Sequence, residues 1–260
     1  MKEFNALEEK EKIVKWIRDW FDKNGPKATA VVGLSGGKDS TIVAALLKEA
    51  LGAERVMGVL MPRGIQPDID DSKSVVEMLG IPAVIINVGP AADALMESIK
   101  NAEFFGPGTK EAFAEDSVPI TRDLKINIPP RIRMSTLYAV AQSLPNGGRV
   151  ANTCNKSEDY VGYSTKYGDA AGDFSPLSDF TVREVLAIGE ALGLSERLVH
   201  KTPSDGLSGM SDEEKLGFTY EMLDEYILTG KCPDEEIKKK IDRLHTINEH
   251  KLKVIPSYKR

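Results

Sequence analysis

The stretch ATAVVGLSGGKDSTIVAALLKEAL, residues 28–51, decides the fold. Residues 28–34 form a short apolar run with β-branched valines, which predicts a buried strand. Residues 40–51 place apolar side chains at helical spacing and are followed by Gly52, which predicts a helix with a glycine stop. The serine and glycine residues between the two runs predict a tight turn, so the stretch is a strand, a turn and a helix.

The same alternation of strand and helix patterns continues to residue 102. Strands are expected at 56–61 and 83–88, and helices at 70–79 and 91–102. An amphipathic helix precedes them, with an apolar stripe made of Phe4, Leu7, Val14, Ile17 and Phe21. Apolar strands separated by helices are typical of a parallel sheet covered on both faces. We therefore expect an α/β fold with a Rossmann-like, doubly wound parallel sheet and ligands at the carboxyl ends of its strands.

The second half of the sequence has a less regular pattern. Residues 103–125 are rich in glycine, proline and charge and predict a loop, either a lid or an idle surface segment. A helix over 129–144 with Pro130 in its first turn, a strand over 149–153 and a site-forming loop over 155–179 follow. Three more helices are expected at 180–192, 212–228 and 234–249. No linker divides residues 1–260, which predicts one domain with a helical C-terminal elaboration.

Composition argues against several classes of protein. The net charge of -6 argues against a protein that coats nucleic acid, and no apolar run approaches a membrane span. The N-terminus has no signal-peptide core, which predicts a cytoplasmic protein. Cys154 and Cys232 lie far apart without a C-x-x-C pair, which argues against a zinc site or a disulfide framework. The negative net charge is still compatible with a small anionic ligand, because a few backbone N–H groups can bind one.

The turn carries residues suited to phosphate, namely Gly33, Leu34, Ser35, Gly36, Gly37, Lys38, Asp39 and Ser40. It leads into a helix N-terminus, where free N–H groups and the helix dipole attract an anion. The glycines let the backbone wrap phosphates, the hydroxyls can donate, and Asp39 can hold magnesium. The spacing matches neither a Walker A loop nor G-x-G-x-x-G. An ordinary connecting turn is the alternative, which the combination of strand, motif and helix disfavours.

This loop resembles the S-G-G-x-D-S motif of the N-type ATP pyrophosphatases, which adenylate a substrate and release pyrophosphate. Later segments resemble the ammonia-dependent NAD synthetases of that superfamily, in order along almost the whole chain. These segments are GVLMP (58–62) with Gln66 and Asp71, NIPPRIRM (127–134), NTCNKSE (152–158), STKYGD (164–169), GDFSPL (172–177) and HK (250–251).

The resemblance implies a ligase that forms a C–N bond. Its reaction would be the ATP-dependent amidation of deamido-NAD⁺ with ammonia, giving NAD⁺, AMP and pyrophosphate through an adenylated carboxylate. It implies that ATP contacts the loop from Gly33 to Ser40 together with Thr153 and Ser204, and that Asp39 and Glu158 bind Mg²⁺. The residues implied to contact deamido-NAD⁺ are Arg131, Lys166, Asp173, His250 and Lys251.

The family is homodimeric with the dinucleotide site at the interface, so the resemblance also implies a homodimer. Asp39, Glu158 and Asp173 would be the catalytic residues, and we expect Asp173 to bind ammonium and accept its proton. Free ammonia is the expected nitrogen source, because neither cysteine lies in an amidohydrolase-like setting. The alternatives are a tRNA-modifying adenylating enzyme, which should show a basic face, and a nucleotide-binding module without catalysis.

Three positions depart from the family pattern. Val182 stands where the family usually has a lysine that is thought to reach ATP, and Arg183 beside it would point about 100° away on a helix. Either another cation replaces that lysine or ATP is held more weakly. Pro129 replaces a common lysine, and Asn152 replaces a common glycine before Thr153.

Overall fold

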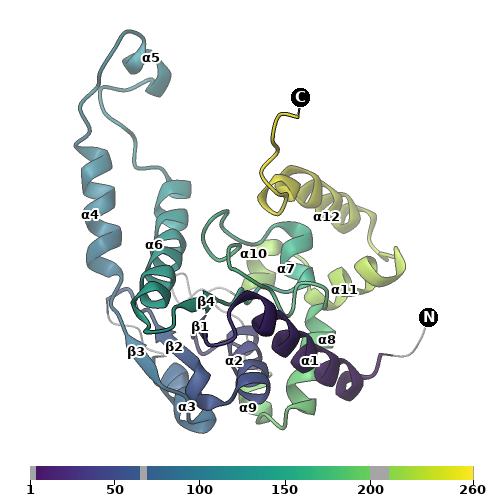
Figure 1. Ribbon diagram of the computed structural model, residues 1–260. Coiled ribbons are helices and arrows are strands. Elements are labelled where there is room, and N and C mark those ends of the chain that lie inside the picture. Colours follow the sequence, from purple (N-terminus) through teal and green to yellow (C-terminus); the bar gives the residue numbers. More distant parts are fainter. Residues whose placement is uncertain (1–3, 65–68, 200–210, 260) are drawn as a thin grey trace.

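The computed structural model describes residues 4–64, 69–199 and 211–259 (Figure 1). In these ranges the chain forms a four-stranded sheet in the order β3-β2-β1-β4, and every pairing is parallel. The strands are β1 (Thr29–Gly33), β2 (Val56–Leu60), β3 (Ala83–Ile85) and β4 (Gly148–Val150). Val31 lies opposite Met57 on one side and opposite Val150 on the other. The predicted parallel α/β sheet is confirmed.

The strand order reverses between β1 and β4. From β1 the chain steps outward through β2 to β3 and then crosses to the opposite edge. Ligands of open α/β sheets bind outside the carboxyl ends of the strands at such a switch point. The loop after β1 and the segment after β4 lie at that point, so the topology brings these two segments to one edge of the sheet.

Helices cover both faces of the sheet. On one face, Ala30 and Val32 of β1 pack in a cluster with residues of α1 (Ala6–Asn24), α2 (Lys38–Leu51), α3 (Ile69–Leu79) and α8 (Val182–Ala191). On the other face, Val31 packs with residues of α6 (Arg122–Ser143). This alternation follows from the strand period of two.

The first helix is fixed by its ends and by its apolar stripe. The Asn5 side chain caps α1 by accepting from the N–H of Glu8, and Gly25 ends it. Val14, Ile17 and Phe21 are buried, as the stripe predicts. Phe4 and Leu7 are exposed, although the Phe4 ring lies 6.3 Å from that of Phe180 between their centres.

The C-terminal part is helical and has an apolar cluster of its own. The helices of this part besides α8 are α7 (Lys156–Val161), α9 (Glu196–Val199), α10 (Asp212–Leu216), α11 (Tyr220–Thr229), α12 (Glu235–Asn248) and the short η2 (Glu249–Lys251). The cluster includes Val161, Val182, Phe218, Tyr220 and Leu223, from α7, α8, α11 and the turn before α11. Leu198 of α9 packs instead against the cluster that covers the sheet. The predicted helical elaboration is confirmed.

Several predicted boundaries are wrong. Thr121 caps α6 by accepting from Leu124, so the helix begins at Arg122 and Pro130 lies well inside it. The segment expected to be a loop over 103–125 therefore contains α5 (Thr109–Phe113) and the start of α6. Gly217 has φ +74°, a left-handed conformation that ends α10, so the helix expected over 212–228 is two helices.

An arm made of α4 (Gly89–Lys100), α5 and the first half of α6 extends from the body of the molecule (Figure 1). It carries large apolar side chains on its surface, of which Phe105 is 97% exposed. Leu95, Phe113 and Ile126 are exposed as well. No helix in the part of the chain that the structure describes is both long and apolar enough to cross a membrane.

Candidate functional site

The loop after β1 is a narrow turn held by its own hydroxyls. The Ser35 hydroxyl accepts from the N–H of Gly37 at 3.2 Å and lies 3.2 Å from the Ser40 hydroxyl. Gly36 has φ +76°, and a Cβ there would lie 3.0 Å from the backbone nitrogen of Ser72. No described side chain caps the N-terminus of α2 at Gly37. The first N–H groups of α2 are therefore available to an anion.

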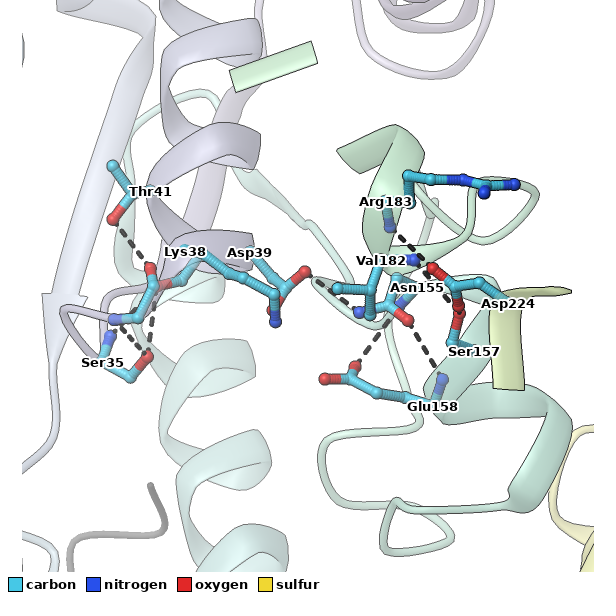
Figure 2. Close-up of polar contacts among 12 residues, drawn as sticks. Ser35, Lys38, Asp39, Thr41, Asn155, Ser157, Glu158, Val182, Arg183 and Asp224 are labelled. Carbon is cyan, nitrogen blue, oxygen red and sulfur yellow. Dashed lines mark hydrogen bonds and ion pairs between the residues drawn. The ribbon is translucent and has the colours of Figure 1, made fainter. Parts of the chain in front are cut away.

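Two carboxylates from different helices face each other across Asn155 (Figure 2). The Asn155 amide donates to Asp39 Oδ1 at 3.0 Å, and its oxygen accepts from the N–H of Glu158 at 3.0 Å. The Glu158 side chain in turn accepts from the N–H of Asn155, which completes a capping box. The structure thus joins Asp39 and Glu158 through a residue that our sequence analysis did not single out, although its N-x-x-E spacing is a capping-box signal.

The electrostatics of this pair favour a divalent cation. Burial, followed by the negative charge of Asp39, raises the pKa of Glu158 well above its usual range. Carboxylates are hard oxygen donors, and Mg²⁺ binds such groups while it keeps water and phosphate oxygens as its other ligands. Asp39 and Glu158 therefore fit a magnesium ion.

Lys38 is a buried cation beside this pair. It is 4% exposed, and its ammonium lies 2.7 Å from Asp39 Oδ2. Burial lowers the pKa of Lys38, but the charges of Asp39 and Glu158 outweigh burial, so the pKa lies above its ordinary value. Lys38 is therefore a protonated cation at neutral pH, which neutralises part of the acidic pair.

The predicted dinucleotide-binding cations lie around one loop. Arg131 of α6 donates to the carbonyl of Lys166 at 3.2 Å, and the Lys166 ammonium donates to the carbonyl of His250 at 2.9 Å. The Lys251 ammonium donates to the carbonyls of Gly162 and Ser164 at 2.7 and 2.9 Å. The structure thus brings together four predicted residues that are up to 120 positions apart in the sequence.

The Asp173 carboxylate lies between β4 and α6 and accepts hydrogen bonds from both elements. Its Oδ2 accepts from the N–H of Val150 at 2.7 Å, and its Oδ1 accepts from the Tyr138 hydroxyl at 3.1 Å. Burial, followed by the charge of Asp173, raises the pKa of Tyr138 to about 12, so this phenol stays a donor at neutral pH. Within the described ranges, Asp173 forms no hydrogen bond or ion pair with Asp39 or Glu158.

Asn152 organises the segment that carries these groups. Its amide nitrogen donates to the carbonyls of Asp169 and Ala171, and its oxygen accepts from Cys154 N–H and the Ser175 hydroxyl. This residue, a departure from the family pattern, thus holds the loop on which Asp169 and Asp173 lie. Thr153 beside it is partly buried. Ser204 and Gln66 lie outside the described residues.

The C-terminal helix anchors α7, which carries Glu158. The Asn248 amide donates to the carbonyl of Val161 at 3.1 Å, and His245 Nδ1 lies 2.8 Å from the carbonyl of Tyr160. With the bonds of Lys251, these contacts satisfy carbonyls at the end of α7, which would otherwise lack partners. The position of Glu158 therefore depends on the end of α12 and on η2.

Gly162 allows this close approach. It has φ +65°, and a Cβ there would lie 2.1 Å from Asn248 Cβ. We expect Gly162→Ala to lower the free energy of unfolding by about 2–5 kcal/mol, because overpacking costs about 1–3 kcal/mol and a left-handed backbone about 1–2 kcal/mol. Urea denaturation measures this change.

The control is Gly230→Ala at the end of α11. Gly230 has φ +73°, and a Cβ there meets no heavy atom of the described chain within 4 Å. Only the left-handed backbone should cost stability, about 1–2 kcal/mol. Equal losses in the two variants would contradict the packing role of Gly162.

Parallel strands with a glycine loop at the carboxyl end of β1 and an uncapped helix N-terminus define a Rossmann-like α/β protein with an anion site at its switch point. The family model "NAD synthase" matches residues 9–259. The chain belongs to the NAD synthase family. The family expected from the sequence is thereby confirmed.

Individual relatives agree with this assignment. An NH(3)-dependent NAD(+) synthetase of Carboxydothermus hydrogenoformans is 36% identical over 96% of both chains. A structure of NMN synthetase from Francisella tularensis is similar with a TM-score of 0.84 and 30% identity, over 98% of this chain and 99% of that one. An NH3-dependent NAD synthetase from Campylobacter jejuni has a TM-score of 0.74 and 27% identity, over 99% and 100%.

Proposed function

We propose that this protein makes NAD⁺ from deamido-NAD⁺, ammonia and ATP. Membership of the NAD synthase family supports this, and so do curated relatives named NH(3)-dependent NAD(+) synthetases that match over nearly the full chain. The observation that carries the chemistry is the Asp39–Asn155–Glu158 arrangement beside an uncapped helix N-terminus. It provides anion-binding N–H groups and two cation-binding carboxylates at one point.

The reaction needs activation because a carboxylate does not react with ammonia at neutral pH. In the proposed first step, a carboxylate oxygen of the nicotinate attacks the α-phosphorus of ATP, the bond to the bridging oxygen breaks, and pyrophosphate leaves. Backbone N–H groups of residues 38–40 would stabilise the charge on the departing phosphates. Mg²⁺ held by Asp39 and Glu158 would supply further charge neutralisation.

In the second step, ammonia attacks the carbonyl carbon of the adenylate. The C–O bond to AMP breaks, the amide forms, and one proton is released. Asp173 is the proposed acceptor of the proton that ammonium must lose before ammonia can attack, and Arg131, Lys166, His250 and Lys251 are the proposed contacts to the dinucleotide. The cluster that these four residues form around residues 162–166 supports a shared role.

The test of the function is a mixture of purified protein, Mg-ATP, deamido-NAD⁺ and ammonium, analysed for NAD⁺, AMP and pyrophosphate. Equal amounts of the three products are expected. Formation of ADP would contradict an ATP pyrophosphatase. Glutamine in place of ammonium should give no product, and product from glutamine alone would contradict the proposed nitrogen source.

A second candidate substrate follows from one comparison. The NMN synthetase from Francisella tularensis is the more similar in backbone of the two structures compared, with a TM-score of 0.84 against 0.74 for the enzyme from Campylobacter jejuni. The corresponding acid, nicotinate mononucleotide, carries the same reactive carboxylate but lacks the adenosine half. The ratio of kcat/KM for the two acids, measured with the same enzyme, decides between them.

We also propose that the protein is a homodimer. The arm of α4, α5 and α6 exposes Leu95, Phe105, Phe113 and Ile126, and the edge strand β3 exposes Val84 and Ile85. A second copy of the chain would cover this apolar surface in a two-fold arrangement. Light scattering should give twice the chain mass of 28.5 kDa. A monomer at micromolar concentration would contradict this proposal.

A further inference from the structure

A buried carboxylate on α11 lies where three helices meet. Asp224 is 1% exposed, and its Oδ2 accepts from the N–H of Arg183 at 2.8 Å. Its Oδ1 accepts from the hydroxyl of Ser157, and that hydroxyl accepts from the N–H of Val182 at 3.1 Å (Figure 2). The two N–H groups belong to the first turn of α8, and Ser157 belongs to the first turn of α7. One carboxylate therefore joins α11 to the beginnings of both other helices.

Burial of the Asp224 charge opposes folding. Burial raises the pKa of this carboxyl, and the hydrogen bonds from Ser157 and from the Arg183 N–H offset the rise only in part. Among the described residues, no cationic side chain forms an ion pair with Asp224, and the Arg183 guanidinium lies 3.9 Å from Glu225 instead. A buried carboxylate without a cation costs free energy that an apolar side chain would not. Fold stability alone therefore does not account for a carboxylate at this position.

The carboxylate provides two acceptors in a fixed arrangement. Asparagine has the same shape, but one end of its amide is an N–H donor. That donor end would face either the N–H of Arg183 or the hydroxyl of Ser157, which already accepts from Val182. An ionised carboxylate accepts from both partners at once, whereas an amide cannot. The chemistry of Asp224 thus favours one arrangement of α7 relative to α8.

This arrangement sets the direction of the proposed magnesium ligand Glu158. Ser157 directly precedes Glu158 in α7, and successive side chains of a helix point about 100° apart. A fixed direction for Ser157 therefore fixes the direction of Glu158. The Asn155 amide lies in the same turn, where it donates to Asp39 and accepts from the Glu158 N–H. A rotation of α7 about its axis would disturb both contacts.

We propose that Asp224 is a positioning residue for the magnesium site: through Ser157 it fixes the rotation of α7 and holds the Glu158 carboxylate in place. The inference rests on the proposed binding of Mg²⁺ by Asp39 and Glu158. Within the described ranges, Asp224 forms no hydrogen bond with either of these residues. Its substitution should therefore weaken metal binding while the reacting groups themselves stay unchanged.

The test variant is Asp224→Asn. Mn²⁺ is the probe, because it binds the same oxygen ligands as Mg²⁺ and its free ion gives an electron paramagnetic resonance signal. Mn²⁺ binding to the substrate-free protein should weaken roughly tenfold, the usual effect of losing a group that orients a metal ligand. The Mg²⁺ concentration that half-activates AMP formation should rise by a similar factor. The value of kcat at saturating Mg²⁺ should change by less than about threefold, because the groups that contact the substrates are unchanged.

Two controls separate positioning from stability. Asp242→Asn is the same chemical change at another contact between helices, where Asp242 of α12 accepts from the Tyr226 hydroxyl of α11 at 2.6 Å. Val185→Ala removes fully buried apolar groups from α8 but none of the hydrogen bonds of Asp224. Thermal unfolding should show a loss of stability for Val185→Ala. Both controls should bind Mn²⁺ like the wild type, and weakened binding by Val185→Ala equal to that of Asp224→Asn would indicate a purely structural role.

A double-mutant cycle tests the route through Ser157. Ser157→Ala removes the hydroxyl and keeps the Asp224 carboxylate, so it should weaken Mn²⁺ binding by about the same factor as Asp224→Asn. The combined variant should be no weaker than the more affected single variant, because both changes break one connection. Independent effects that multiply would contradict a role of Asp224 through Ser157. If Asp224→Asn does not fold, Ser157→Ala alone decides whether the connection matters.

The outcomes separate this inference from the proposed function. If the wild type forms no AMP, the proposed function fails, and the Mn²⁺ affinities still decide the role of Asp224. If Asp39→Asn binds Mn²⁺ as tightly as the wild type, the metal site is wrong and the inference fails with it. If Asp39→Asn loses Mn²⁺ while Asp224→Asn and Ser157→Ala keep the wild-type affinity, Asp224 is not a positioning residue.

Discussion

Asp39→Asn is expected to lower kcat for NAD⁺ formation by about a thousandfold, since charge stabilisation by a bound metal is worth several kcal/mol. Asparagine keeps the size of the side chain and can still accept from the Asn155 amide. It removes the negative charge that would hold Mg²⁺ and that pairs with Lys38. Initial rates of AMP formation across a range of Mg²⁺ concentrations measure this effect.

The control is Asp179→Asn, the same chemical change at the surface. The Asp179 side chain is 90% exposed and pairs with Lys156 at 3.0 Å. An exposed pair of this kind contributes little, so its rate should equal that of the wild type. A normal rate for Asp39→Asn at limiting Mg²⁺ would show that Asp39 holds no metal.

Glu158 gives a less direct test of the same site. Its side chain accepts from the N–H of Asn155, and its own N–H donates to Asn155 Oδ1, so it also caps α7. Alanine at this position would remove the charge together with the side-chain half of the capping box, whereas Asn155 would still cap α7. Asp39 contributes no such cap, because the N-terminus of α2 has none among the described side chains. Substitution of Asp39 therefore isolates the charge.

The loop and its flanking elements could be predicted from sequence because their determinants are local. Residues 28–33 form an apolar run that predicts a strand, and the glycines after it predict the turn. Apolar residues at helical spacing after the turn predict α2. Local signals also mislead where two of them compete. Pro130 predicts a helix start, but Thr121 caps α6 well before it, and the helix accommodates the proline in its interior. Gly217 ends α10, whose five residues include one apolar residue, so the sequence pattern before the glycine is too short to separate α10 from α11.

The clustering of the site could not be derived from local patterns. Lys166 contacts the carbonyl of His250, and Lys251 contacts those of Gly162 and Ser164, over separations of 84 to 89 residues. The acceptors are backbone carbonyls, which every residue has. The amino-acid type at an acceptor position therefore gives no indication of these bonds. Resemblance to a family predicted a role for these residues, whereas their mutual contacts depend on the packing of α12 against α7.

Asp173→Asn is expected to reduce amidation by about 10²–10⁴-fold, the usual contribution of a positioned proton acceptor. Both carboxylate oxygens of Asp173 already accept one hydrogen bond, from Val150 and from Tyr138. Each has a second acceptor site, so the carboxylate can still take a proton from ammonium. Asparagine lacks that capacity. Exchange of labelled pyrophosphate into ATP should persist, since adenylation precedes the ammonia step.

The pH profile distinguishes proton transfer from a structural role. With asparagine at position 173, only ammonia that is already unprotonated can react, so the residual amidation rate should rise with pH together with that fraction. Tyr138→Phe supplies the matched structural control. It removes one bond to Asp173 but keeps the carboxylate, so it should cost about 0.5–1.5 kcal/mol of stability and leave the shape of the pH profile unchanged. If Asp173→Asn amidates at the wild-type rate across pH, Asp173 is not the proton acceptor and serves only to hold β4 against α6.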